Sequence, residues 1–239
     1  MSRGCSRCSE AVTVSIRKPA IVVNFKTYPE ASGQNALELA RICEKVASET
    51  GVSIVVAPPT ADLALIASAV SIPVFAQHLD SVPSGSTTGH VTVENAKASG
   101  AKGTLVNHSE RRIRIAEIHE IIDKCRGTGL ATIVCTNNLA VSKAAAAMEP
   151  DFVAIEPPQL IGGDISVTTA NPAIVSDTVR SIREISRGVA VLCGAGVKNG
   201  RDVAKAIELG TDGVLLASGV VKAKDKRAVM LDLVSGIEK

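Results

Sequence analysis

The stretch IHEIIDKCRGTGLATIVC, residues 118–135, contains the unit that decides the fold. Four of its apolar residues recur at helical spacing and form one apolar face: Ile118, Ile121, Ile122 and Cys125. Gly129 follows at the point where such a helix ends. The short apolar run 131–135 then has the composition of a strand that is buried on both faces. The stretch therefore predicts a helix, a turn and a strand of a parallel sheet.

Short apolar runs of this kind recur eight times from Pro19 onward, each four to six residues long. They are residues 20–25, 53–57, 73–76, 103–106, 131–135, 152–155, 189–193 and 213–216. Helical periodicity lies between several of them, and Gly51, Gly100 and Gly210 stand where helices end. Eight strands alternating with helices in about 220 residues predict an α/β fold, a single-domain (β/α)8 barrel over residues 19–239.

A doubly wound sheet is the alternative fold. It typically has about five or six strands and a G-x-G-x-x-G motif after the first of them. The first run here ends in Asn24, Phe25 and Lys26, without a glycine. The barrel is therefore the favoured prediction.

The composition excludes several classes of protein. The chain has 239 residues, of which 46% are hydrophobic and 21% charged, and its formal net charge is +2. No apolar run approaches the roughly 18 residues of a membrane-spanning helix, so we expect no membrane partner. The 26 basic residues barely exceed the 24 acidic ones, and aromatic residues make up only 2%. We therefore expect no nucleic-acid partner.

The six cysteines do not form a recognisable metal site. Four of them lie in strand-like or helical segments, as is common in reduced cytoplasmic proteins. Cys5 and Cys8 form a lone C-x-x-C pair, and no second pair of ligands follows at zinc spacing. We expect a cytoplasmic protein without a metal.

Residues 1–18 differ from the rest of the chain. They hold four basic residues against the single acid Glu10, and they are rich in serine, as in an organelle transit peptide. Gly4 and the β-branched run 12–16 oppose the amphipathic helix that such a peptide needs. The preferred prediction is a flexible N-terminal extension over residues 1–18.

Polar residues follow the ends of several predicted strands. Asn24 and Lys26 end the first, His108 follows the fourth, and Glu156 follows the sixth. In a barrel of parallel strands the reactive groups lie at these carboxyl ends. Turns of small residues after the sixth, seventh and eighth strands can offer free backbone N–H groups to a phosphate. The pattern predicts acid/base chemistry on a small phosphorylated substrate.

Three motifs in this order carry a family resemblance. They are Asn24-x-Lys26-Thr27-Tyr28, Asn107-His108-Ser109-Glu110-Arg111-Arg112 and Glu156-Pro157-Pro158-x-Leu160-Ile161-Gly162. Over residues 20–239 the chain resembles the triosephosphate isomerase family, in its short archaeal form. The resemblance implies a TIM barrel and an aldose-ketose isomerase of glycolysis and gluconeogenesis that uses no cofactor.

The resemblance also implies roles for single residues. Glu156 matches the general base, and His108 matches the electrophile that hydrogen-bonds the developing enediolate. Lys26 supplies fixed positive charge, and Asn24 binds the carbonyl oxygen. We expect His108 to lie at the beginning of a helix, whose dipole disfavours the imidazolium. Glu110 is expected to pair with Lys26 or with a neighbouring subunit.

Further residues correspond to the phosphate site and to a lid. Residues 157–164 correspond to the lid loop that closes over the substrate. The expected phosphate-binding residues, besides Asn24 and Lys26, are Ile161, Gly162, Gly194, Gly196, Ala217 and Ser218. The segment from Asp80 to Val91 matches a loop that docks into a neighbouring subunit, so we expect a dimer or a tetramer.

Two other functions compete with this one. Another phosphate-binding barrel isomerase or synthase would lack the combination of the His108 and Glu156 motifs. A non-catalytic phosphosugar-binding barrel would keep Gly162, Gly196 and Ser218, but it would have no need of Glu156 or His108.

Overall fold

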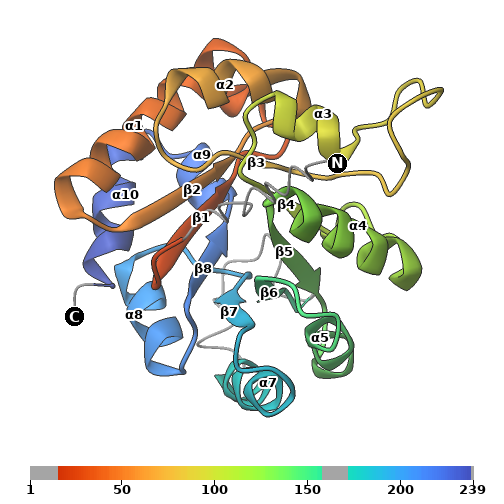
Figure 1. Cartoon of the computed structure of the whole chain (residues 1–239). Helices are drawn as coiled ribbons and strands as arrows, with labels where there is room; N and C mark the ends of the chain where they lie inside the picture. Colours follow the sequence, from red (N-terminus) through yellow and green to blue (C-terminus); the bar gives the residue numbers. More distant parts are fainter. Residues whose placement is uncertain (1–15, 158–171, 238–239) are drawn as a thin grey trace, which may run out of the picture.

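The structure is a computed structural model that describes residues 16–157 and 172–237. Within them, eight parallel strands form a ring enclosed by helices (Figure 1). The strands are β1 (Ala20–Asn24), β2 (Ser53–Ala57), β3 (Phe75–Ala76), β4 (Gly103–Val106), β5 (Ala131–Thr136), β6 (Phe152–Ile155), β7 (Ala190–Cys193) and β8 (Gly213–Leu216). Each falls on a predicted apolar run, which confirms the predicted strands.

The order of the strands closes the ring. Neighbouring strands pair in the order β2-β1-β8-β7-β6-β5-β4-β3, and every pair is parallel. A single parallel bridge between Val56 and Val74 joins the two ends of this order, and the Val56 N–H donates to the Pro73 carbonyl oxygen at 3.1 Å. Strand β3 is shorter than the predicted run 73–76. The (β/α)8 barrel is therefore confirmed as the fold.

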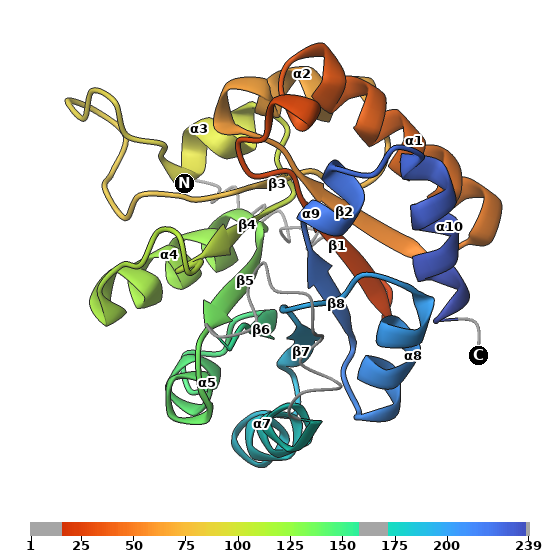
Figure 2. The same cartoon turned by 180° about the vertical axis from the view of Figure 1, so that it is seen from behind.

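The helices lie outside the ring when it is viewed from either side (Figures 1 and 2). They are α1 (Gln34–Thr50), α2 (Leu63–Ala69), α3 (Val93–Ala98), α4 (Ile115–Thr128), α5 (Leu139–Ala146), α7 (Pro172–Ile185), α8 (Gly200–Glu208), α9 (Ser218–Val221) and α10 (Lys226–Ser235), with the 3-10 turns η1 (Pro29–Ala31) and η2 (Thr60–Asp62). Gly51 and Gly129 end α1 and α4 in the left-handed conformation, as predicted. None of the helices in the described ranges is long and apolar enough to cross a bilayer.

Alternation along the strands separates two buried layers. Ile21 and Val23 of β1 pack in the cluster that includes the helices, whereas Ala20 and Val22 belong to the barrel interior. The interior is filled by side chains such as Val55, Phe75, Leu105, Ile133, Phe152, Ala154, Leu192 and Leu215. Because the side-chain period is two, Asn24 follows Val22 and Glu156 follows Ala154 on the inward side. The barrel packing thus brings these two polar residues to one rim.

Contacts with the barrel begin before Pro19. Ile16 packs in the interior cluster, and the Arg17 Nη2 donates to the Gly51 carbonyl oxygen at 3.0 Å. The Lys18 ammonium lies 5.7 Å from the centre of the Phe152 ring. Residues 1–15, which make up most of the predicted extension and include Cys5 and Cys8, lie outside the described residues.

Candidate active site

The carboxyl ends of the strands surround one hollow. Its lining consists of Asn24, Lys26, Tyr28, His108, Glu156, Gly194, Ala195, Gly196, Val197, Lys198, Leu215, Leu216, Ala217, Ser218 and Gly219. Eight predicted site residues are among them, although they come from distant parts of the sequence. The other two, Ile161 and Gly162, and most of the predicted lid over 157–164 lie outside the described residues.

Lys26 lies in a turn after β1 with a left-handed backbone, φ +50°. It does not continue the strand in extended form, in contrast to the sequence expectation. Its N–H donates to the Asn24 Oδ1 at 2.9 Å, and its carbonyl oxygen accepts from the Gln77 Nε2 at 2.8 Å. A left-handed residue other than glycine persists where its surroundings hold it on several sides. Asn24 and Gln77 provide these contacts.

The ammonium group of Lys26 is fixed by Glu110. Lys26 Nζ lies 2.7 Å from the Glu110 Oε1, which confirms the expected pairing within one chain. The lysine side chain is 14% exposed, and that of Glu110 is 59% exposed. The hollow therefore contains a positive charge that is largely shielded from water, where its effect on an anion is stronger than in solvent.

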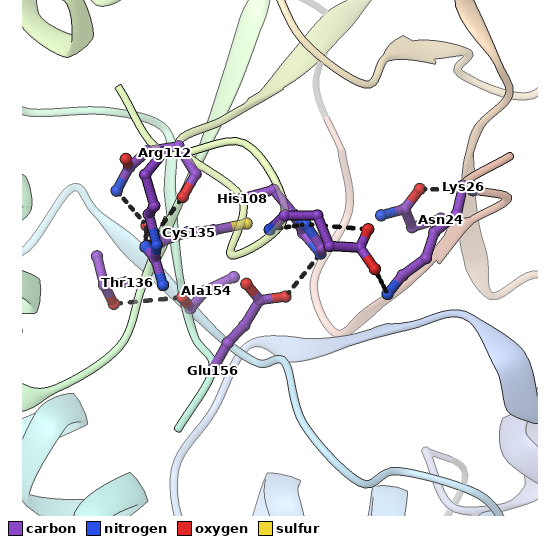
Figure 3. A network of polar contacts seen from close by, with 10 residues as sticks. Asn24, Lys26, His108, Arg112, Cys135, Thr136, Ala154 and Glu156 are labelled. Atoms are coloured by element: carbon purple, nitrogen blue, oxygen red, sulfur yellow. Dashed lines mark hydrogen bonds and ion pairs between the residues drawn. The ribbon is translucent and has the colours of Figure 1, made fainter. Parts of the chain in front are cut away.

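His108 lies in a turn directly after β4. The N–H of Glu110 donates to its Nδ1 at 3.2 Å. Because Nδ1 accepts this bond, the proton of the neutral ring is on Nε2. Nε2 lies 3.4 Å from the Glu156 Oε1 (Figure 3). The imidazole N–H and the carboxylate thus face each other at the hollow.

Burial and neighbouring cations keep this imidazole neutral. Desolvation, with smaller contributions from the charges of Lys26 and Arg112, lowers the pKa of His108 to about 4 against an opposing effect of Glu110. The predicted contribution of a helix dipole was wrong. Helix α4 begins only at Ile115, because residues 109–112 form a turn in which the Arg111 N–H donates to the His108 carbonyl oxygen.

Glu156 is the buried carboxylate of the site. It directly follows β6, its N–H donates to the Thr136 carbonyl oxygen at 2.7 Å, and its side chain is only 3% exposed. Desolvation raises the pKa of its carboxyl group to about 7, against the opposing effects of the nearby Cys135 thiol and the charge of Lys26. The Oε2 atom is buried and has no hydrogen-bond partner within the described part of the chain. A dehydrated carboxylate with a pKa near neutrality suits a general base.

Small residues form part of the wall of the hollow. Gly196 has φ +71°, which favours glycine, and Ser218 begins α9. The first N–H groups of a helix have no partner within the helix and can bind an anion. The phosphate-binding roles of Gly194, Gly196, Ala217 and Ser218 stay predictions.

Gly194 also makes room for the Glu156 side chain. A Cβ atom at this position would lie 2.6 Å from the Glu156 Cγ and 3.1 Å from the Ile155 carbonyl oxygen. The absence of a side chain therefore sets where the carboxylate can lie, which the strand pattern alone did not reveal.

We expect Gly194→Ala to lower kcat about tenfold or more while the barrel stays folded, because the added methyl displaces the Glu156 side chain. Steady-state kinetics and thermal unfolding measure the two effects. Gly188→Ala is the matched control, because its nearest contact would be 3.9 Å away, at the Ser186 Oγ. Equal kcat values for the two variants would contradict the steric role of Gly194.

Several residues near the hollow were not predicted as site residues. Tyr28 lies two residues beyond Lys26, and its ring lies 4.6 Å from the Lys222 ammonium. Lys198 follows the small-residue turn at Gly196. Tyr28 belongs to the first motif and Lys198 lies two residues beyond Gly196, but neither position in the sequence reveals the direction of the side chain. Among residues 16–157 and 172–237, no three His, Cys, Asp or Glu side chains gather as metal ligands.

Comparison with known proteins agrees with this geometry. The profile of the triosephosphate isomerase family matches residues 19–236. The triosephosphate isomerase of Methanocaldococcus jannaschii is 53% identical over 217 residues, which are 91% of this chain and 99% of the relative. Those of Methanothermus fervidus and Methanobacterium bryantii are 52% and 53% identical, over 91% and 92% of this chain and 98% and 97% of the relatives. The chain belongs to the triosephosphate isomerase family.

Proposed function

We propose that the chain interconverts dihydroxyacetone phosphate and D-glyceraldehyde 3-phosphate by proton transfer through an enediolate. The family profile and relatives of about half identity over nine-tenths of the chain support this isomerase activity. The structural observation that carries the mechanism is the facing pair in the hollow, with the His108 Nε2 3.4 Å from the Glu156 Oε1. We expect the reaction to need no cofactor and to serve glycolysis and gluconeogenesis in the cytoplasm.

The facing pair of Glu156 and His108 supports separate roles, with the carboxylate as the base and the imidazole as the acid. The Glu156 carboxylate takes a proton from the carbon next to the substrate carbonyl, and the electron pair of that C–H bond forms the enediolate. The His108 Nε2–H gives its proton to the carbonyl oxygen that becomes negative, and the same nitrogen then takes the hydroxyl proton from the carbon that Glu156 deprotonated. Glu156 then returns its proton to the neighbouring carbon, so that substrate and product are isomers. A neutral imidazole suits this role because Nδ1 is held as an acceptor.

The positive charge and the small-residue wall support binding of the anion. Lys26 lies at the hollow with its ammonium fixed by Glu110, and it stabilises both the developing oxyanion and the phosphate. Asn24 lies beside it, where it can bind the substrate carbonyl oxygen. The backbone groups at Gly196 and at the start of α9 complete the proposed phosphate site.

A coupled assay tests the activity. The purified chain receives D-glyceraldehyde 3-phosphate, and the dihydroxyacetone phosphate formed is reduced by a glycerol-phosphate dehydrogenase, with NADH oxidation as the signal. Fast turnover without added metal supports the proposal. A folded chain that binds a phosphorylated analogue without turnover would instead support the phosphosugar-binding barrel.

The pKa values predict the pH dependence of kcat/KM. Glu156 must be charged to act as base, so kcat/KM is expected to fall about tenfold per unit below a midpoint near pH 7. His108, with a pKa of about 4, stays neutral over this range and adds no second limb above about pH 5. The pKa of the substrate phosphate is measured by titration of the free substrate, so that its ionisation can be distinguished from that of Glu156. A midpoint near the ordinary glutamate pKa would contradict a dehydrated base.

We also propose that copies of the chain associate through the loop from Asp80 to Val91. The loop projects from the barrel between β3 and α3 (Figure 1), and most of its residues are exposed. The Asp80 N–H donates to the Val91 carbonyl oxygen at 2.8 Å, and the Val91 N–H donates to the Asp80 Oδ2 at 2.7 Å. Light scattering should give twice or four times the mass of the chain. A monomer at millimolar concentration would overturn this proposal.

A further inference from the structure

Arg112 contacts backbone next to the proposed electrophile. Its Nη1 donates to the Asn107 carbonyl oxygen at 3.0 Å and, less closely, to the Cys135 carbonyl oxygen at 3.4 Å (Figure 3). The first of these oxygens belongs to the peptide group that joins Asn107 to His108. The second lies near the carboxyl end of β5. The guanidinium group of Arg112 thus links the peptide group between Asn107 and His108 to the neighbouring strand β5.

The backbone at this peptide is held in an uncommon conformation. Asn107 has φ +59° and is not a glycine. Its Nδ2 donates to the Cys135 carbonyl oxygen at 3.0 Å, and its Oδ1 accepts from the Ile113 N–H at 3.1 Å. Left-handed asparagine persists where several contacts hold it. These two bonds and the two from Arg112 hold the backbone of this turn against the end of β5.

Arg112 is also a cation without an acidic partner in the described part of the chain. The adjacent Arg111 differs, since its Nη2 lies 3.5 Å from the Asp80 Oδ1. Among the described residues, the structure shows an ion pair for Arg111 but none for Arg112. The unpaired charge of Arg112 lowers the pKa of His108 and that of Glu156. Its contribution is smaller than that of desolvation in both cases.

We propose that Arg112 is a positioning residue for the isomerisation. Its guanidinium group holds the peptide between Asn107 and His108 against the end of β5, so that the imidazole faces Glu156 across the hollow. This inference rests on the proposed function, because the imidazole acts in that reaction. A purely structural role would affect stability but not the geometry of the imidazole or its electrostatic surroundings.

Three variants separate the contact from the charge. Arg112→Met removes both, Arg112→Lys keeps the charge but loses the planar fork, and Arg114→Met removes the same charge two positions later. Arg114 is a suitable control because its side chain is 84% exposed and pairs with Glu117 on the surface. Thermal unfolding establishes that each variant is folded.

We expect Arg112→Met to lower kcat about tenfold to a hundredfold with KM changed less than about threefold, because a misplaced acid affects the transition state most. The acid limb of kcat/KM should move upward by about half a pH unit or more, since a cation near Glu156 is lost. Arg112→Lys should have the same acid limb of kcat/KM as the parent, and its kcat should lie between those of Arg112→Met and the parent. Arg114→Met should match the parent in both.

Nitrogen-15 NMR of the imidazole gives a readout that does not depend on activity. The His108 signals are assigned by their absence in His108→Gln. In the parent we expect the neutral Nε2–H form, and in Arg112→Met we expect shifted signals and a higher pKa for His108. If Arg112→Met does not fold, Arg112→Lys tests the same point. In this variant we expect shifted His108 signals and a His108 pKa equal to that of the parent.

The outcomes distinguish the two proposals. A parent without isomerase activity would overturn the proposed function, and the NMR experiment would still test whether Arg112 positions the ring. An active parent whose Arg112 variants keep its kcat, acid limb and imidazole signals would overturn the role of Arg112. An equal effect of Arg114→Met would also overturn it, because the cause would then be general surface charge.

Discussion

Glu156→Gln should lower kcat on the order of 10⁴-fold with little change in KM. The amide has nearly the shape of the carboxyl group but cannot accept the substrate proton. The side chain is 3% exposed and faces the His108 Nε2, and no other carboxylate is among the described residues that line the hollow. The coupled assay measures this loss. Glu120→Gln, on the exposed side of α4, is the control and should keep the activity of the parent.

The same variant should be more stable than the parent at alkaline pH. Because the folded-state pKa of Glu156 is raised to about 7, the folded parent binds more protons than the unfolded chain between about pH 4.5 and 7. Its free energy of unfolding therefore falls as pH rises through this window. Glutamine lacks this dependence, so the gain is near zero below pH 4.5 and reaches at most about 3 kcal/mol above pH 7. Urea unfolding at both pH values measures it.

Two results would contradict the assignment of the base. A variant that retains most of its activity would show that another group removes the proton. A variant that is inactive and also less stable than the parent at pH 8 would point to a structural role for the carboxylate.

His108→Gln should lower kcat about 10²–10³-fold, or about 3–4 kcal/mol, which is typical for the loss of one well-placed donor to an oxyanion. The ring lies in the hollow with its Nδ1 held by the Glu110 N–H. Glutamine can still donate a hydrogen bond, but it cannot accept and return a proton at the same atom. The loss should appear in kcat and kcat/KM alike, because the interaction forms mainly in the transition state.

His119→Gln is the matched control for this prediction. His119 lies on the outer surface of α4 with its side chain 57% exposed, and its Nε2 lies 3.6 Å from the Asp123 Oδ2. Its replacement should leave kcat unchanged. A His108 variant with more than a tenth of the parent activity would show that the imidazole is not the electrophile.

Much of the fold could be predicted from local patterns. Apolar runs such as 152–155 end where the observed strands end, because a strand buried on both faces consists mostly of apolar residues. The two inward positions Asn24 and Glu156 follow from the period of two in the strand. The ring itself followed from the number of strands, since eight alternating units close into a barrel.

The features that depend on contacts between distant residues could not be predicted in this way. The proposed electrophile His108 lies in a turn and not at a helix start, and the preceding Asn107 bonds across to β5. Arg112 is an exposed cation, and its contacts with two backbone carbonyls cannot be seen in the sequence. Gly194 reads as a phosphate donor, while its closest neighbour is the Glu156 side chain. Each of these depends on which strands become neighbours.

The single bridge between β2 and β3 makes the ring unequal around its circumference. Ladders of five and four residue pairs join β1 to β2 and β4 to β5, whereas Val56 and Val74 form the only bridge observed between these two segments of the described chain. We call this junction between β2 and β3 the seam. Gln77 reinforces it, since its Nε2 donates to the carbonyl oxygens of Ala57 and Lys26. Local opening should therefore begin at the seam, and the Val56 amide should exchange with deuterium before those of β1. Exchange at this one amide would then report how firmly the backbone of Lys26 is held.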